Sequence, residues 1–192
     1  MMRGEGVFVA VAGPSGSGKD SVLNYARARL GPLAERIVFA RRIITRAELA
    51  GSEAHDTLTA QAFEQALRAG HFALSWDANG LRYALPASLD EDMRRGRVVV
   101  ANVSRAAILP LRERYAHVVP VIVTAPRAVL AERLAARGRE SRMEVEARLV
   151  RAASADCTIP GAHVIDNAGA LEIAGERFLA LLREACAVHD NS

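Results

Sequence analysis

A glycine-rich segment near the N-terminus constrains the fold of this chain more than any other feature. An apolar run at residues 7–12 precedes it and predicts a buried strand, and a helical pattern at residues 21–30 follows it. A strand, a G-x-x-x-x-G-K loop and a helix in this order are typical of a phosphate-binding P-loop. The glycines let several backbone N–H groups point at one anion, and the helix adds the positive end of its dipole. We expect the segment to bind the phosphates of a nucleotide through Gly13, Pro14, Ser15, Gly16, Ser17, Gly18, Lys19, Asp20 and Ser21.

Lys19 is the one lysine of the chain, and all other members of the 25 Lys and Arg residues are arginine. A composition that otherwise uses arginine keeps a compact ammonium at the position that reaches the outer phosphates of a nucleotide. We therefore expect Lys19 to be catalytic. The alternative is a glycine-rich turn that carries a lysine by chance.

The residue after Lys19 departs from the usual motif, in which a Ser or Thr hydroxyl binds Mg²⁺. Asp20 stands there, with Ser21 behind it. Asp20 is either an acid favoured by the helix dipole or a carboxylate ligand for magnesium, a metal that prefers oxygen donors. We favour the metal role and expect Mg²⁺ to be held by Asp20, Ser21 or both.

Length and composition limit the remaining possibilities. The 192 residues predict a single domain, and 51% hydrophobic residues suffice for a sizeable core. The net charge of +3 comes from scattered arginines, so we expect small-molecule substrates and no nucleic acid as partner. The apolar N-terminal run is too short for a signal peptide or membrane span, and the two distant cysteines fit a reducing compartment. We expect a cytoplasmic protein that binds no membrane, and we leave a homodimer open.

Further apolar runs at residues 37–40, 97–103, 118–123 and 164–166 predict strands, and helical patterns separate them. Between the first two lie a predicted loop at 51–56, a helix that Thr59 caps, and a hairpin over residues 71–83 with Asn79-Gly80 in its turn. A short helix is expected at 88–95, one that Ser104 caps and Pro110 kinks at 104–115, one to residue 137, and a last one at 170–188 with Ile173 on its apolar face. This alternation predicts an α/β fold with a parallel sheet covered on both faces.

Polar and basic residues follow several of these strands, and ligands bind beyond the carboxyl ends of strands in such sheets. Arg41, Arg42 and Arg46 come after the second strand, where they either form a solvated charged loop or bind a phosphate. For Arg46, which follows Thr45, we favour phosphate binding. The end of the next apolar strand carries Asn102, and Arg105 follows it. P-loop enzymes commonly carry a magnesium-binding aspartate at such a strand end. The acid absent from this strand end is, by hypothesis, the one gained at Asp20.

Residues 136–154 combine two helical patterns around Gly138 with a high density of charges. Such a segment is typical of a lid whose arginines neutralise charge on a transferring phosphoryl group, or of an exposed turn with Glu–Arg pairs. We expect Arg137, Arg139 and Arg148 to act in a lid.

Taken in order, these motifs resemble guanylate kinase-like P-loop kinases over nearly the whole chain. They are GPSGSGK, the pair Thr45-Arg46, Phe63, Gly70-x-Phe72, Tyr83, and the pattern Arg133-Leu134, Arg137-Gly138, Arg148-Leu149 and Ala152. The strings GPSGSGKDS, RRIITR, FALSWDANGLRYALP, NVSRA and RGRE are most similar to the ribose 1,5-bisphosphate phosphokinase family within that group.

The resemblance implies a three-layer P-loop NTPase fold, with a five-stranded parallel sheet of order 2-3-1-4-5. Its core would comprise residues 1–35, 96–135 and 155–192, with an acceptor-binding region at 36–95 and a lid at about 136–154. It also implies ATP and Mg²⁺, transfer of the γ-phosphoryl group onto the 1-phosphate of ribose 1,5-bisphosphate, and acceptor binding by Arg42, Arg46, His55, Tyr83, Asn102 and Arg105.

The departures from guanylate kinases concern the groups that read guanine. Leu74 stands in place of a glutamate, and Tyr83-Ala84-Leu85-Pro86 replaces a segment that supplies a hydroxyl. A pocket without these hydrogen-bonding groups should reject guanine. Two alternatives remain open: a nucleoside monophosphate kinase and a catalytically inactive binding module.

Overall fold

A computed structural model describes residues 6–45, 55–78, 80–136 and 159–190 of the chain. Five parallel strands form its main sheet, in the order β2 (Ile37–Phe39), β7 (Val98–Asn102), β1 (Val7–Ala12), β8 (Val118–Thr124) and β9 (His163–Asp166). Numbered along the chain within this sheet alone, the order is 2-3-1-4-5, which confirms the predicted topology. All six residues of the central strand β1 are buried, as expected of a parallel strand covered on both faces.

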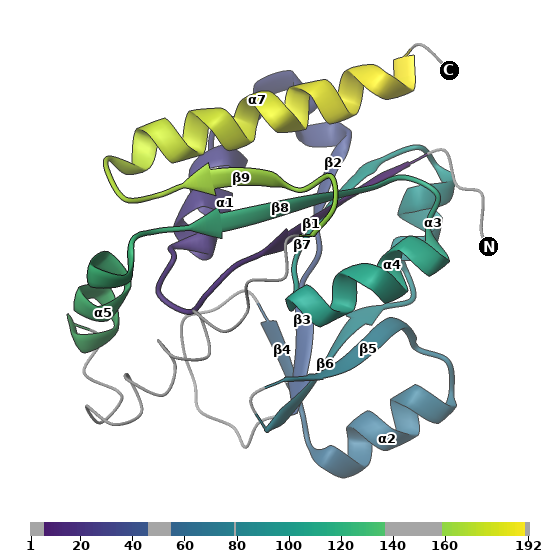
Figure 1. Ribbon diagram of the computed structural model, residues 1–192. Coiled ribbons are helices and arrows are strands. Elements are labelled where there is room, and N and C mark those ends of the chain that lie inside the picture. Colours follow the sequence, from purple (N-terminus) through teal and green to yellow (C-terminus); the bar gives the residue numbers. More distant parts are fainter. Residues whose placement is uncertain (1–5, 46–54, 79, 137–158, 191–192) are drawn as a thin grey trace.

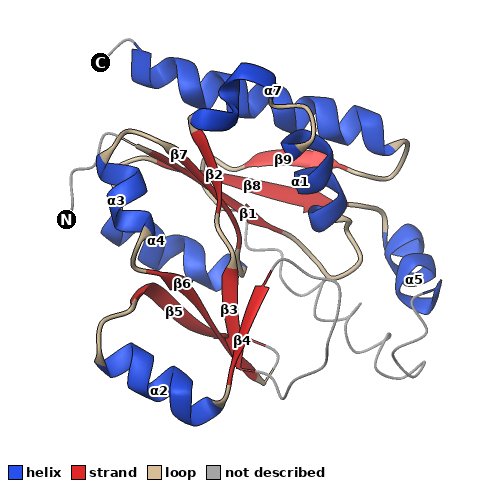
Figure 2. Ribbon diagram, turned by 180° about the vertical axis from the view of Figure 1, so that it is seen from behind, coloured by secondary structure: helices blue, strands red, loops and turns tan. Residues whose placement is uncertain are grey.

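Alternate residues of β1 pack into two separate cores. Val7, Val9 and Val11 lie in a core with α1 (Lys19–Arg27) and α7 (Leu171–Asp190). Phe8 and Ala10 face the other way, toward α3 (Leu89–Arg94) and α4 (Ile108–Arg114). Figure 1 shows α3 and α4 on the near side of the sheet, and Figure 2 shows α1 and α7 from the opposite side. The sheet between two helical layers confirms the predicted three-layer α/β architecture.

The helices α1 and α7 approach closely at one point. Gly175 lies so near Tyr25 that a Cβ atom at residue 175 would overlap the tyrosine ring. The Tyr25 hydroxyl donates a hydrogen bond of 2.9 Å to Glu176 Oε1. A glycine in the first half of α7 therefore sets the distance between the two helices on this face.

A polar cluster joins α3 to the end of α4 beside the second core. Asp90 accepts hydrogen bonds from the Tyr115 hydroxyl at 2.6 Å and from Arg114 Nε at 3.1 Å. Burial alone would raise the pKa of Asp90, but these hydrogen bonds outweigh it and the pKa lies below its usual value. Burial, together with the hydrogen bond to Asp90, raises the pKa of Tyr115, whose ring stacks on Phe8.

A second, smaller sheet lies below the main sheet in Figure 1, with the order β4 (His55–Leu58), β3 (Arg42–Thr45), β6 (Leu81–Pro86) and β5 (Phe72–Ala78). The β5–β6 hairpin was predicted, and β3 pairs antiparallel with β6 and parallel with β4. The prediction of a loop at 51–56 is wrong for His55 and Asp56, which begin β4. A polar sequence of this kind forms a strand because a partner strand pairs with it, which no local pattern reveals.

The helix boundaries follow the predicted caps. Thr59 accepts a hydrogen bond from the Ala62 N–H at the start of α2 (Ala60–Arg68), and Ser104 accepts one from Ala107 at η2 (Arg105–Ala107). Pro110 causes no break because it lies in the first turn of α4, where its missing N–H is not needed. The remaining helices are η1 (Gly31–Glu35) and α5 (Arg127–Ala136).

One predicted core residue is wrong: Ile173 is 57% exposed. It lies in the first turn of α7. Among the described helices, none has the length and apolar content needed to cross a membrane.

Candidate active site

The glycine-rich loop joins β1 to α1 at the carboxyl edge of the main sheet. Gly13 lies against β8, and a Cβ atom there would overlap the Val123 carbonyl oxygen. Gly18 has φ of 81°, in the left-handed region, and a Cβ atom on it would overlap the Asn167 side-chain amide. The loop is therefore fitted so closely to β8 and to the residue after β9 that these two positions require glycine.

Lys19 is the first residue of α1, and its ammonium turns back over the loop. Its Nζ donates hydrogen bonds of 2.9 Å to the carbonyl oxygens of Gly13 and Pro14. The cation is thus held against the loop whose backbone amides would surround a phosphate.

The structure brings Asp20 and the end of β7 together. Asn102 Nδ2 donates a hydrogen bond of 2.9 Å to Asp20 Oδ1, although the two residues are 82 positions apart. The strand-end position and the residue after the P-loop lysine are the two places where P-loop enzymes carry magnesium ligands. In this chain the first holds an amide and the second a carboxylate, and they are in contact.

Behind the loop lies a residue that the sequence reasoning missed. Asn167 is 3% exposed, its Nδ2 donates to the Ser17 carbonyl oxygen at 2.8 Å, and its backbone N–H donates to the Thr124 carbonyl oxygen at 2.8 Å. Its place directly after β9, at the carboxyl edge of the sheet, is the sequence signal that could have found it.

Polar atoms without a partner collect around this point. Of the described residues, Ser17 Oγ, Arg133 Nη1 and Asn167 Oδ1 are buried and make no hydrogen bond. Ser17 and Arg133 offer donors, and Arg133 Nη1 lies 3.7 Å from where a Cβ on Gly18 would be. Donors of this kind beside the loop fit a phosphorylated ligand such as ATP.

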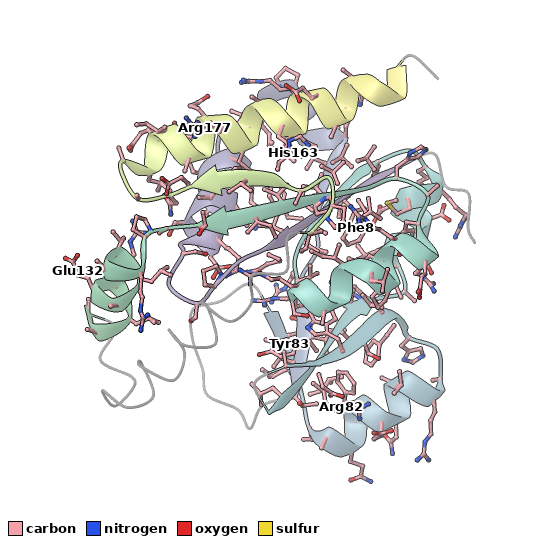
Figure 3. All side chains as sticks on the ribbon, viewed as in Figure 1. Phe8, Arg82, Tyr83, Glu132, His163 and Arg177 are labelled. Atoms are coloured by element: carbon pink, nitrogen blue, oxygen red, sulfur yellow. The ribbon has the colours of Figure 1, made fainter. Side chains whose placement is uncertain are left out.

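The second sheet carries a different group of side chains. Tyr83 stacks on Trp76 with ring centroids 5.6 Å apart, and the Arg42 guanidinium lies 5.9 Å from the Tyr83 centroid. Arg82 projects from the opposite face toward α2, where it pairs with Glu64, and it also pairs with Asp77 of the neighbouring strand β5 (Figure 3). The side chains of the adjacent residues Arg82 and Tyr83 therefore point to opposite faces of the sheet, as the two-residue period of a strand requires.

The arginines of this region differ in their partners. Arg41 forms an ion pair of 2.8 Å with Asp56, whereas within the described residues no carboxylate pairs with Arg42. The strand register places His55 opposite Arg42. Among the described residues, the charge of Arg42 is thus not neutralised by a carboxylate.

The other predicted residues are distributed as follows. Arg105 begins η2, three residues after Asn102, and β5 of the second sheet packs against η2. The second sheet thereby lies next to the carboxyl end of β7. The predicted residues Arg46, Arg137, Arg139 and Arg148 lie outside the described part of the chain.

The fold and the loop together define a P-loop protein with the guanylate kinase fold. The crystal structure of guanylate kinase from Anaplasma phagocytophilum superposes with a TM-score of 0.68 at 20% identity, covering 96% of this chain and 88% of that one. A family model described as an AAA domain matches residues 9–151.

Two relatives of high sequence identity show the family to which the chain belongs. The ribose 1,5-bisphosphate phosphokinase PhnN of Chelativorans sp. (strain BNC1) is 67% identical over 97% of this chain and 89% of its own length. The protein of the same name from Brucella melitensis biotype 2 (strain ATCC 23457) is 46% identical over 94% and 93%. The chain therefore belongs to the ribose 1,5-bisphosphate phosphokinase family, which confirms the resemblance seen in its motifs.

Proposed function

We propose that this protein transfers the γ-phosphoryl group of ATP to the 1-phosphate of ribose 1,5-bisphosphate and so forms 5-phosphoribosyl 1-diphosphate. A 1-phosphate oxygen forms a bond to the γ-phosphorus, the bond from that phosphorus to the β,γ-bridging oxygen breaks, and ADP leaves. Its relatives carry this substrate in their names. As an enzyme of phosphonate metabolism it would work in the cytoplasm on small molecules.

The observation that carries the choice of acceptor is the packing of the second sheet. Leu74 and Leu85, at the positions where guanylate kinases read guanine, both pack into the apolar core with α3 and α4. Leu85 is fully buried. Neither side chain offers a purine a hydrogen bond, whereas Arg42 on the same sheet offers a cation to a phosphate.

The chain's residues fit ATP and a magnesium ion. The backbone amides of residues 13–18 and the Lys19 ammonium would hold the β- and γ-phosphates, with Ser17 and Arg133 as further donors. Asp20 and Ser21 would hold Mg²⁺, which neutralises charge on the phosphate oxygens when bound. Because Asn102 already donates to Asp20, we assign Asn102 to orienting this carboxylate rather than to binding the acceptor.

For the acceptor we propose Arg42, Tyr83 and His55 on the second sheet, with Arg105 beside them and Arg46 from outside the described residues. Arg137, Arg139 and Arg148 remain proposed lid residues. The attacking group is already a phosphate oxyanion and needs no general base. Positioning and charge neutralisation by the lysine and arginines would supply the catalysis.

A coupled assay that detects ADP tests the proposal with four acceptors: ribose 1,5-bisphosphate, ribose 5-phosphate, GMP and AMP. We expect turnover with the bisphosphate and its conversion to 5-phosphoribosyl 1-diphosphate. Turnover with GMP alone would make the protein a guanylate kinase, and no turnover with any acceptor would favour an inactive binding module.

The variant Arg42→Met tests the acceptor face, with Arg82→Met as the matched control on the opposite face. Loss of one charged hydrogen-bond donor should raise the KM for the bisphosphate about tenfold or more in Arg42→Met and leave the KM for ATP unchanged. The proposal for Arg42 fails if both variants show the same KM for the bisphosphate.

A further inference from the structure

We propose that Asn167 is a positioning residue that sets the orientation of the Ser17–Gly18 peptide and thereby aims the Gly18 N–H at the nucleotide phosphates. This inference rests on the proposed role of the loop as a phosphate site, and it does not depend on the identity of the acceptor.

The first step is the hydrogen bond behind the loop. Asn167 Nδ2 donates to the Ser17 carbonyl oxygen at 2.8 Å and so holds that oxygen toward the β9–α7 connection. The C=O and N–H of a trans peptide point in opposite directions because the peptide is planar. Fixing the Ser17 carbonyl outward therefore fixes the Gly18 N–H on the side of the loop away from Asn167.

The second step is the rigidity of Asn167 itself. Its side chain is almost fully buried, and its backbone N–H is bonded to the Thr124 carbonyl oxygen at the end of β8. The next residue closes a turn in which the Ala168 N–H donates to Asp166 Oδ1 at 3.0 Å. Asn167 is thus fixed by β9, which it directly follows, and by its hydrogen bond to the end of β8. Its bond to the Ser17 carbonyl oxygen therefore fixes the loop relative to these two strands.

The third step explains the glycine of the Gly18-Lys19 pair in this chain. The amide of Asn167 fills the space that a Cβ atom on Gly18 would take. Gly18 also needs its φ of 81°, which L-residues rarely adopt. The Asn167 side chain therefore occupies the volume that a side chain at residue 18 would need, so the asparagine requires a glycine at that position.

Two substitutions separate this role from simple packing. Asn167→Asp keeps the shape of the side chain but replaces the donor to the Ser17 carbonyl oxygen with an oxygen. Asn167→Ala removes the donor outright. Asn24→Asp is the matched control, because it makes the same chemical change on the exposed face of α1.

The experiment measures the binding of ADP and of pyrophosphate by calorimetry, together with the Gly18 amide resonance in ¹H–¹⁵N spectra. Pyrophosphate probes the loop without contacts to the base. We expect both Asn167 variants to bind each probe about tenfold or more weakly. We also expect ADP to shift the Gly18 amide downfield in the native protein, and we expect this shift to be lost in both variants. Asn24→Asp should behave like the native protein.

The double variant Gly18→Ala/Asn167→Ala completes the test. Since Gly18→Ala already displaces the peptide, adding Asn167→Ala should cost no further ADP affinity, whereas independent roles would give additive losses. Native-like ADP affinity with an unchanged Gly18 shift in either folded Asn167 variant would overturn the inference, as would additivity in the double variant. Because ADP binding needs no acceptor, these outcomes stay separate from failure of the ribose 1,5-bisphosphate assay.

Discussion

Replacing Asp20 by asparagine should raise the Mg²⁺ concentration required for half-maximal turnover by about thirtyfold. Asp20 is exposed beside the loop, so a high dielectric applies. Two unit charges 4 Å apart in water interact by about 1 kcal/mol, and the doubled charge of Mg²⁺ makes this about 2 kcal/mol, or about thirtyfold in affinity. Turnover at several Mg²⁺ concentrations with saturating ATP measures the change directly.

The same substitution should have the opposite effect on nucleotide binding without metal. The Asp20 carboxylate repels the phosphates when no cation lies between them, so Asp20→Asn should bind ADP about threefold to tenfold more tightly in EDTA. A residue that merely stabilises the start of α1 would not produce two effects of opposite sign. Calorimetry with ADP in EDTA and in Mg²⁺ reports both.

The contact with Asn102 supplies a second check. Asn102→Leu removes a hydrogen bond worth about 1 kcal/mol and should raise the Mg²⁺ requirement about fivefold, less than Asp20→Asn does. Glu132→Gln, on the side of α5 that points away from the molecule in Figure 3, is the control for loss of an acidic charge. If Asp20→Asn has the Mg²⁺ requirement of Glu132→Gln, Asp20 does not bind the metal.

Two further predictions concern the packing that supports the site. Asp90→Asn should lower the free energy of unfolding by about 1–2 kcal/mol at pH 7, because it weakens the hydrogen bonds that Arg114 and Tyr115 donate to residue 90. The partial exposure of Arg114 keeps this loss of stability small. The folded-state pKa of Asp90 is lowered, so this stability is complete above its unfolded pKa of about 3.9 and is lost as the pH falls through the folded-state value. Urea unfolding should show the difference between native and variant closing below about pH 4, and a difference independent of pH would contradict the assignment. Gly175→Ala should destabilise the protein by about 1–2 kcal/mol, since overlap with the Tyr25 ring outweighs the gain in helix propensity, and Tyr25→Ala should remove most of that penalty in the double variant. Thermal melts of the native protein, the two single variants and the double variant measure this coupling between residues 25 and 175. A Gly175→Ala variant more stable than the native protein would refute the predicted overlap.

The main sheet and the P-loop could be predicted because their signals are local. Continuous apolar runs identify parallel strands, and the glycine–lysine spacing between strand β1 and helix α1 identifies a phosphate loop. The caps at Thr59 and Ser104 were predicted for the same reason, since a cap involves residues only three positions apart. Recognition of the family rested on these motifs and their order.

The contacts that complete the site were decided by the tertiary structure. Asn167 reaches Ser17 across 150 positions and Asn102 reaches Asp20 across 82, and the strand β4 at His55 exists because β3 pairs with it. The sequence by itself determined which residues could bind phosphate and where the parallel strands run. The hydrogen bonds from Asn167 to Ser17 and from Asn102 to Asp20 depended on the tertiary structure. They form only after the sheet has brought together strand ends that are distant in the sequence.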